Sequence, residues 1–215
     1  SPVAKAERVR RVYKRHHDWM SRIFPSWTGA RELTEAELDD WVEIAYRNCT
    51  LCDRCMANCP LAVDTAQILL AARGVLLAAG KAPEMLVQLA DAALVREENL
   101  DFFKEFFLEQ LKELETEVKD RLGNDKASIP VEVEGAKILY VPLSGAHTIT
   151  PLATVFNAVG ESWTISMFEA ANYATYVGDI PKAKRIAERI LKEAERLKVQ
   201  EIVITECGHA YHTMR

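Results

Sequence analysis

The sequence predicts a fold of class α+α/β, with a helical first part and a small α/β domain that contains a parallel sheet. Two observations support this class. In the first half of the chain, apolar residues recur at helical spacing. After about residue 130, short apolar runs alternate with helical segments, which is typical of parallel sheets. The linker G-N-D-K-A-S-I-P separates the two patterns, so we expect domains at 1–128 and 129–215.

Capping residues mark the helices of the first part. Thr34 and Glu37 form a capping box, and the helix that they begin leads to Cys49. Asp64 is a helix N-cap, and Gly80 suits the end of the same helix. The expected helices are 4–22, a helix from 34 with the apolar stripe Leu38, Trp41, Val42 and Ala45, then 64–80, 83–96 and 99–122.

The second part contains short apolar runs of the kind that form buried strands. Helical segments lie between these runs, so the strands should pair in parallel. The expected strands are 136–142, 162–166 and 201–205, and the expected helices are 150–160 and 181–197.

Composition excludes several classes of protein. The 215 residues are 49% hydrophobic and 27% charged, which argues against disorder, and a net charge of -5 argues against general nucleic-acid binding. The longest apolar run, 66–80, is too short to span a bilayer and contains Arg73. No secretory signal is visible at the start of the sequence, and the cysteines are clustered. We therefore expect a reducing, cytoplasmic location, with the cytoplasmic membrane periphery as an alternative.

Four of the five cysteines lie within eleven residues, followed by Pro60. Cys49, Cys52, Cys55 and Cys59 have the spacing C-x2-C-x2-C-x3-C-P, the bacterial ferredoxin pattern for a 4Fe-4S cluster. Two intervening residues let the chain curl so that successive thiolates face successive irons. We therefore predict that these four cysteines bind a 4Fe-4S cluster in a helical ferredoxin-like domain.

Two questions stay open at this site. Four thiolates could instead hold structural zinc, although zinc sites usually join two C-x2-C arms from separate places. In two-cluster ferredoxins the fourth cysteine of the run binds the other cluster. Cys59 could therefore return to the same cluster, be replaced by Cys207 or a non-cysteine ligand, or serve a second motif elsewhere.

Cys207 is the fifth cysteine, in the stretch I-T-E-C-G-H-A-Y-H. It follows a predicted strand, at the edge where α/β sheets place their sites. It is a candidate additional ligand or redox residue, and the alternative is a free thiol in a loop. The catalytic residues are unknown.

The residues N-C-T-L-C-D-R-C-M-A-N-C-P, followed by A-A-R-G-V-L-L-A-A-G-K-A-P-E-M-L, resemble proteins of the heterodisulfide reductase family that are similar to its D subunit. This family of cysteine-rich-domain iron–sulfur oxidoreductases includes the K subunit of the sulfite-reduction-associated membrane complex. The resemblance covers about residues 35–215. It implies a helical ferredoxin-like domain followed by one or two cysteine-rich α/β domains, in which a second cluster supports dithiol–disulfide chemistry.

The second domain departs from the family pattern. Ser144 and Ala210 stand where the family has cysteines, and F-E-A-A-N-Y-A-T-Y-V-G-D replaces the Cys-Cys-Gly segment. Cys207 is the ligand position that survives. We therefore expect a degenerate α/β domain that does not hold the family's catalytic cluster alone, and a chain that is part of a longer protein.

The resulting hypothesis is an electron-transfer component of a redox complex, with other subunits and a membrane-bound electron carrier as candidate partners. Its cluster would relay electrons toward a thiol/disulfide or sulfur-compound site. One alternative is a non-catalytic protein-interaction module stabilised by its metal. Another is a thiol enzyme that uses Cys207.

Overall fold

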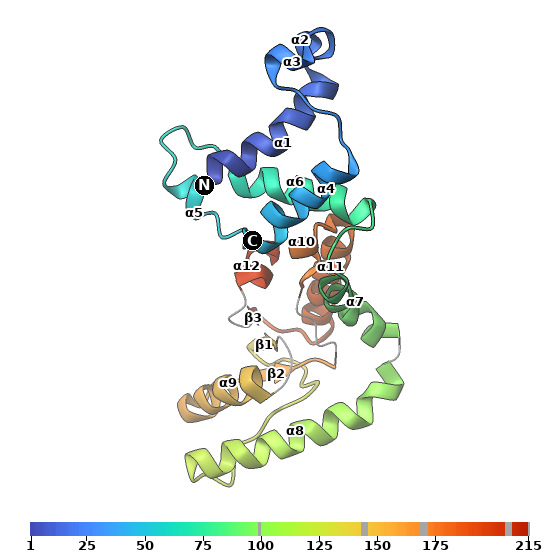
Figure 1. Cartoon of the computed structure of the whole chain (residues 1–215). Coiled ribbons are helices and arrows are strands. Elements are labelled where there is room, and N and C mark those ends of the chain that lie inside the picture. The colour runs from blue at the N-terminus through green and yellow to red at the C-terminus, as the bar shows by residue number, and fades with distance from the viewer. Residues whose placement is uncertain (99, 143–145, 168–171, 205–207, 215) are drawn as a thin grey trace. The chain divides into compact units, whose positions relative to one another are not determined.

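The computed structural model describes residues 1–98, 100–142, 146–167, 172–204 and 208–214 (Figure 1). Side chains are described within these ranges except at 96–98, 100–103, 146, 209 and 212. The chain packs into two units, Ser1–Val87 with Ala174–Ile180, and Gln88–Tyr173 with Pro181–Arg215. A short segment from late in the sequence therefore belongs to the first unit. The predicted domains, a helical ferredoxin-like domain at 1–128 and an α/β domain at 129–215, stay a prediction.

Helices make up the regular structure described for the first unit. They are α1 (Pro2–His17), α2 (Trp19–Ile23), α3 (Pro25–Thr28), α4 (Glu35–Val42), the π-helix η1 (Glu43–Arg47), α5 (Arg54–Ala57), α6 (Thr65–Ala78), the start of α7 (Glu84–Glu98) and α10 (Ala174–Val177).

The predicted helix starts are confirmed by their capping bonds. The Thr34 hydroxyl accepts from the Glu37 N–H at 3.4 Å, and the Asp64 carboxylate accepts from the Gln67 N–H at 2.9 Å. The Glu37 side chain does not complete the capping box, because its carboxylate pairs with Arg31 at 2.9 Å. The predicted helix 4–22 is interrupted at Asp18, whose extended backbone ends α1 and whose side chain caps α2.

The first unit buries the apolar faces of α1, α4, η1 and α6 in one cluster. The predicted stripe lies in or against this cluster, with Trp41 and Ala45 buried and Leu38 and Val42 packed on its rim. The buried members are Val12, Trp41, Ile44, Ala45, Tyr46, Leu69, Ala72 and Leu76.

The second unit combines helices with a small sheet. Its elements are most of α7, α8 (Leu100–Leu122), β1 (Ile138–Val141), α9 (Ala146–Val159), β2 (Trp163–Ile165), most of α11 (Ile180–Arg196), β3 (Glu201–Ile204) and α12 (Gly208–Met214).

The three strands confirm the predicted parallel sheet. They lie in the order β2-β1-β3, and Ile138 of β1 pairs with Trp163 of β2 and Glu201 of β3. Tyr140 makes edge-on ring contacts with Phe156 and Trp163, and α8 contributes Phe107 and Val118 to the same core. Within the described ranges, no helix is long and apolar enough to cross a membrane.

Candidate metal centre

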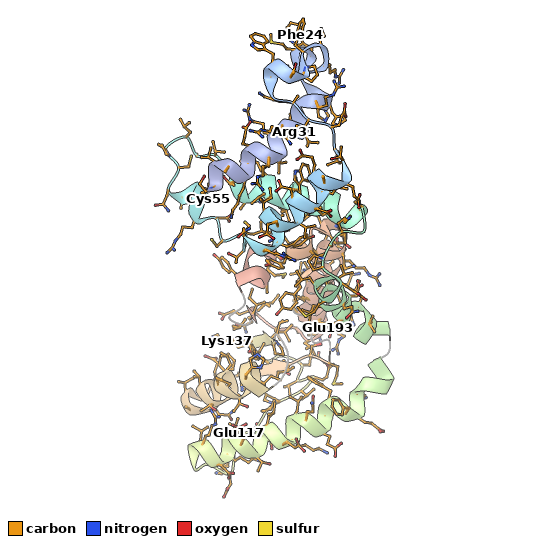
Figure 2. The ribbon with its side chains drawn as sticks, in the orientation of Figure 1. Phe24, Arg31, Cys55, Glu117, Lys137 and Glu193 are labelled. Atoms are coloured by element: carbon orange, nitrogen blue, oxygen red, sulfur yellow. The ribbon has the colours of Figure 1, made fainter. Side chains whose placement is uncertain are left out.

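The cysteine segment follows the π-helix η1 and is largely irregular, with one short helix, α5. Cys52 is exposed, whereas Cys49, Cys55 and Cys59 are half-buried and all four thiols are free (Figure 2 labels Cys55). Single-turn π-helices are frequent at functional sites. Here the π-helix ends at Arg47, two residues before the first cysteine.

The backbone turns sharply on both sides of Cys52. Leu51 and Asp53 each adopt a left-handed conformation with φ of 55°, which is costly for residues with a Cβ atom. The Leu51 N–H points back to the Cys49 sulfur at 3.4 Å, and the Cys59 N–H donates to the Met56 carbonyl at 3.0 Å. These contacts and conformations bend the loop around Cys52.

The donor set has the chemistry of a site for a soft metal. Soft thiolates select iron–sulfur clusters and zinc over hard cations. Among the described residues, however, no three Cys, His, Asp or Glu side chains are placed so that they could hold a metal ion. Ligands of a site that forms with its metal are gathered by binding, so the four cysteines stay the predicted ligands.

The surroundings of Cys52 favour its thiolate form. The backbone N–H of Arg54 and then the Thr50 hydroxyl lower the pKa of this thiol. The thiolate is the metal-binding form of cysteine. The exposed Cys52 is therefore a suitable candidate ligand.

Arg73 is a buried cation beside the cysteine segment. Its side chain is 0% exposed, and it donates to the Cys49 carbonyl at 2.6 Å and to the Ala45 carbonyl at 2.6 and 3.1 Å. It also donates to the Tyr176 carbonyl. These carbonyls include one in η1, near the negative end of the α4–η1 helix, where a cation is favoured.

Two aromatic rings complete the surroundings of Arg73. Its guanidinium carbon lies 4.8 Å from the centre of the Tyr46 ring and 4.1 Å from that of Tyr176. No described Asp or Glu pairs with it. Burial lowers the pKa of Arg73. Among the described residues, no carboxylate balances the charge of its guanidinium.

The sequence did not identify Arg73 as part of the site, because a single Arg in an apolar run signals only that the run does not span a membrane. The contacts that define its role come from residues 28 and 103 positions away in the sequence. An Arg in the middle of an otherwise apolar helix was the available signal.

The segment Ala174–Ile180, from late in the sequence, packs against the residues around Arg73 in the first unit. The Tyr46 hydroxyl donates to the Val177 carbonyl at 2.7 Å, within the buried interior of the first unit. Gly178 has φ of +100°, and a Cβ there would lie 2.6 Å from the Gly74 nitrogen. Glycine is therefore required where this segment meets α6.

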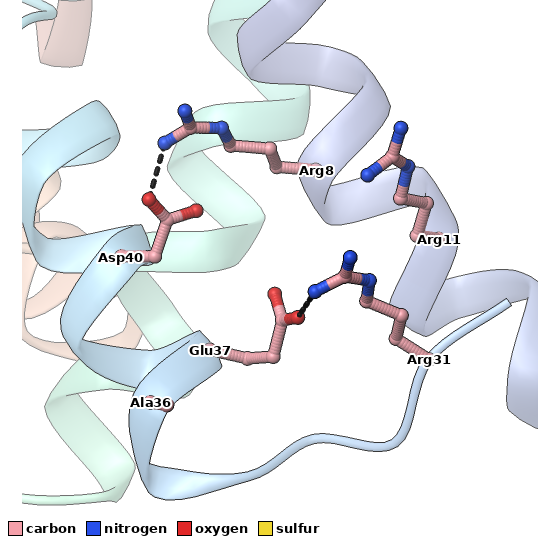
Figure 3. A pocket seen from close by; sticks show the side chains of 6 residues that line it. All are labelled: Arg8, Arg11, Arg31, Ala36, Glu37 and Asp40. Carbon is pink, nitrogen blue, oxygen red and sulfur yellow. Dashed lines mark hydrogen bonds and ion pairs between the residues drawn. The ribbon is translucent and has the colours of Figure 1, made fainter. Parts of the chain in front are cut away.

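A surface pocket of about 330 Å³ in the first unit is lined by three arginines and two acids (Figure 3). Arg8 pairs with Asp40, and Arg31 pairs with Glu37. Arg11 lies 3.5 Å from Glu7. Because each guanidinium has a carboxylate partner, the pocket is an ion-pair network and not an anion site.

Cys207 and Ser144 lie outside the described residues, so their predicted roles stay predictions. Nearby Ala210, where the family has a cysteine, is buried. Asn172 is buried and donates to the Ala183 carbonyl at 2.7 Å, which is a structural role in the second unit.

Two curated proteins are similar to nearly the whole chain. One is the Hdr-like menaquinol oxidoreductase iron-sulfur subunit 2 of Archaeoglobus fulgidus, 31% identical over 223 aligned positions. The other is the Hdr-like menaquinol oxidoreductase iron-sulfur subunit of Archaeoglobus profundus, 29% identical over the same length. The alignments cover 98% of this chain, which spans about 40% of the length of each relative.

This similarity supports the predicted relationship to Hdr-like iron–sulfur proteins, and neither name specifies a D or K subunit. No family model and no solved structure matches the chain.

Proposed function

We propose that the chain is the cluster-binding, electron-transferring part of an Hdr-like oxidoreductase. The observation that carries the proposal is the C-x2-C-x2-C-x3-C-P run in a chain whose curated relatives are named iron–sulfur subunits. A bound 4Fe-4S cluster would supply single-electron transfer. Cys49, Cys52, Cys55 and Cys59 would hold it, and the first unit would serve as the ferredoxin-like domain.

The surroundings of the cysteines support an anionic occupant. Thiolate ligands bring negative charge, and Arg73 places an uncompensated positive charge next to the Cys49 backbone. Hydrogen bonds and nearby charge set the potential of iron–sulfur sites. We infer that Arg73 favours the more negative, reduced state and so raises the reduction potential.

The proposed partners rest on the names of the relatives, which are those of iron–sulfur subunits of a menaquinol oxidoreductase. We propose the same setting here, with other subunits of the complex and a membrane-bound electron carrier as partners. The chain would be an oxidoreductase component on the cytoplasmic side, with electrons passing toward a thiol/disulfide or sulfur-compound site.

Anaerobic reconstitution of the purified chain tests the cluster. We expect broad visible absorption that bleaches with dithionite and an EPR signal from the reduced form. A colourless protein with one zinc per chain would contradict the proposal and support the metal-stabilised interaction module.

Single Cys→Ser variants then assign the ligands. Replacement of Cys49, Cys52, Cys55 or Cys59 should remove most of the bound iron, whereas Cys207→Ser is the matched control and should keep it. If Cys59→Ser keeps the cluster and Cys207→Ser loses it, Cys207 is the fourth ligand.

A further inference from the structure

Helices α2 and α3 form a short tip at the C-terminal end of α1 (Figure 1). Four large apolar side chains of this tip face solvent. Trp27 is 78% exposed, Trp19 67%, Ile23 60% and Phe24 55% (Figure 2 labels Phe24). We call Trp19, Ile23, Phe24 and Trp27 the apolar tip. Exposed large apolar residues that gather in one place mark interaction sites.

The backbone beneath the apolar tip is held by specific bonds, so the exposure is not the fraying of a helix end. Asp18 caps α2 through the Met20 N–H at 3.4 Å and the hydroxyl of the fully buried Ser21. Gly29 ends α3 in a left-handed conformation, and the Ala30 N–H donates to the Pro25 carbonyl at 3.0 Å. The side chains are therefore presented on a fixed platform.

Basic side chains lie beside the apolar tip. Residues 1–31 contain eight Lys and Arg and two acidic residues. Of these basic residues, Arg8, Arg15 and Arg31 pair with the carboxylates of Asp40, Glu32 and Glu37. Arg22 is exposed and bonds the His16 carbonyl, so it has no described carboxylate partner there. Of the two nearest acids, Asp18 is used in capping and Glu32 pairs with Arg15.

Tryptophans beside basic side chains suit one kind of partner in particular. Trp rings favour the level of lipid headgroups, and Lys and Arg are attracted to anionic lipids. Lys14 and Arg22, at the C-terminal end of α1 and in α2, form no ion pair among the described residues. Their charges would favour an approach of the tip to anionic headgroups.

We propose that the apolar tip and its basic neighbours Lys14 and Arg22 dock this chain on an anionic lipid bilayer. Lys5, at the other end of α1, donates to the Asn48 carbonyl next to Cys49. At 1.5 Å per residue, α1 separates the two sites by about 20 Å. The proposal stands on exposure and charge, and it does not depend on the cluster.

Intrinsic fluorescence reports on this surface selectively. The other two tryptophans, Trp41 and Trp163, are 4% and 5% exposed. The whole chain is mixed with phosphatidylcholine vesicles with and without phosphatidylglycerol, and binding is followed by co-sedimentation and by the emission maximum. We expect binding and a blue shift with phosphatidylglycerol vesicles, and release by high salt.

Variants separate the apolar and the basic contributions. Trp19→Ala with Trp27→Ala should weaken binding at least about tenfold through lost apolar contact. Lys14→Gln with Arg22→Gln should weaken it by about fivefold for each charge removed. Met85→Ala and Lys192→Gln are matched controls at exposed positions away from the tip, and they should bind as the parent does. Unchanged circular dichroism confirms that each variant folds.

Three results would overturn the proposal. These are no preference for anionic vesicles, binding that survives the Trp19 and Trp27 changes, and a tip-dependent dimer without lipid. The dimer would assign the surface to a second copy of the chain. Because vesicle binding is read without the cluster, these results do not depend on the outcome of reconstitution.

Discussion

The guanidinium of Arg73 donates a 2.6 Å hydrogen bond to the carbonyl of Cys49, the first cysteine of the predicted ligand set. Through this bond, helix α6 fixes the point at which the chain leaves η1 and enters the cysteine segment. The same side chain brings the one described charge that is buried in the first unit's interior next to that segment. Position and charge thus come from a single residue.

Exchange of Arg73 for Met or Lys should separate these two contributions. Both variants lose the planar guanidinium group that donates to the carbonyls of Ala45, Cys49 and Tyr176. The free energy of unfolding of each variant should therefore be about 3 kcal/mol lower than that of the parent. Arg73→Met alone removes the charge. It should lower the reduction potential of the reconstituted cluster by on the order of tens of millivolts, measured by EPR-monitored titration.

Arg73→Lys is the control for charge, because it keeps a cation at this position. The reduction potential of its reconstituted cluster should stay near that of the parent. If the potentials of both variants equal that of the parent, Arg73 has a structural role only.

Gly178→Ala should strongly destabilise the first unit. A Cβ at this position would lie 2.6 Å from the Gly74 nitrogen and 2.7 Å from the Arg73 carbonyl carbon, and backbone atoms cannot move aside cheaply. We expect a loss of about 3 kcal/mol or more in urea unfolding.

Gly29→Ala is the matched control for Gly178→Ala. Gly29 also has a positive φ, +70°, but nothing lies within 4 Å of the added carbon. It should therefore cost only about 1 kcal/mol from backbone strain. Equal losses in the two variants would mean that Ala174–Ile180 does not pack on α6.

Tyr46 should make the first unit sensitive to alkaline pH. Burial raises the pKa of this phenol from 10.0 to about 12. Because the folded pKa lies above the unfolded value, this contribution to stability is complete below pH 10 and is lost as the pH rises through about 12. Absorbance at alkaline pH should show that Tyr46 titrates late.

Tyr46→Phe should remove the late-titrating phenol and flatten the alkaline fall in stability. It also leaves the Val177 carbonyl without its 2.7 Å hydrogen bond, at a cost of about 1–2 kcal/mol near neutral pH. If the number of late-titrating tyrosines is the same in the variant and in the parent, the assignment to Tyr46 is contradicted.

Glu193 should make the second unit sensitive to acid. Burial raises the pKa of its carboxyl group. Hydrogen bonds from Arg196 and Ser166 and the charge of Arg189 lower this pKa by more than burial raises it, so the net shift is downward. Its contribution to stability is present above the ordinary value of 4.5 and is lost as the pH falls through the lowered folded pKa.

Glu193→Gln should cost about 2 kcal/mol at neutral pH and make acid unfolding less steep. The exposed Glu188 of the same helix α11 is the control, because its ion pair with Lys184 is solvated. Glu188→Gln should change stability by less than about 0.5 kcal/mol. Equal effects of the two substitutions would show that Glu193 is not buried in solution.

Local signals were enough to predict most of the secondary structure. The capping residues Thr34 and Asp64 act within three positions of themselves in the sequence, so their bonds do not depend on the fold. The same holds for the alternation of strands and helices that predicts a parallel sheet. Asp18 shows the limit, because a capping residue inside a basic helical pattern gives a weak signal, and the break after His17 was missed.

The sequence by itself determined which thiols form the candidate site, because the spacing of Cys49, Cys52, Cys55 and Cys59 is a property of a short segment. Only the tertiary structure decided what surrounds that segment. Arg73, Tyr46 and Tyr176 meet across more than a hundred residues, and Gly178 permits the approach. Long-range packing depends on how faces fit together, which no local pattern encodes, and for that reason the buried cation emerged only from the fold.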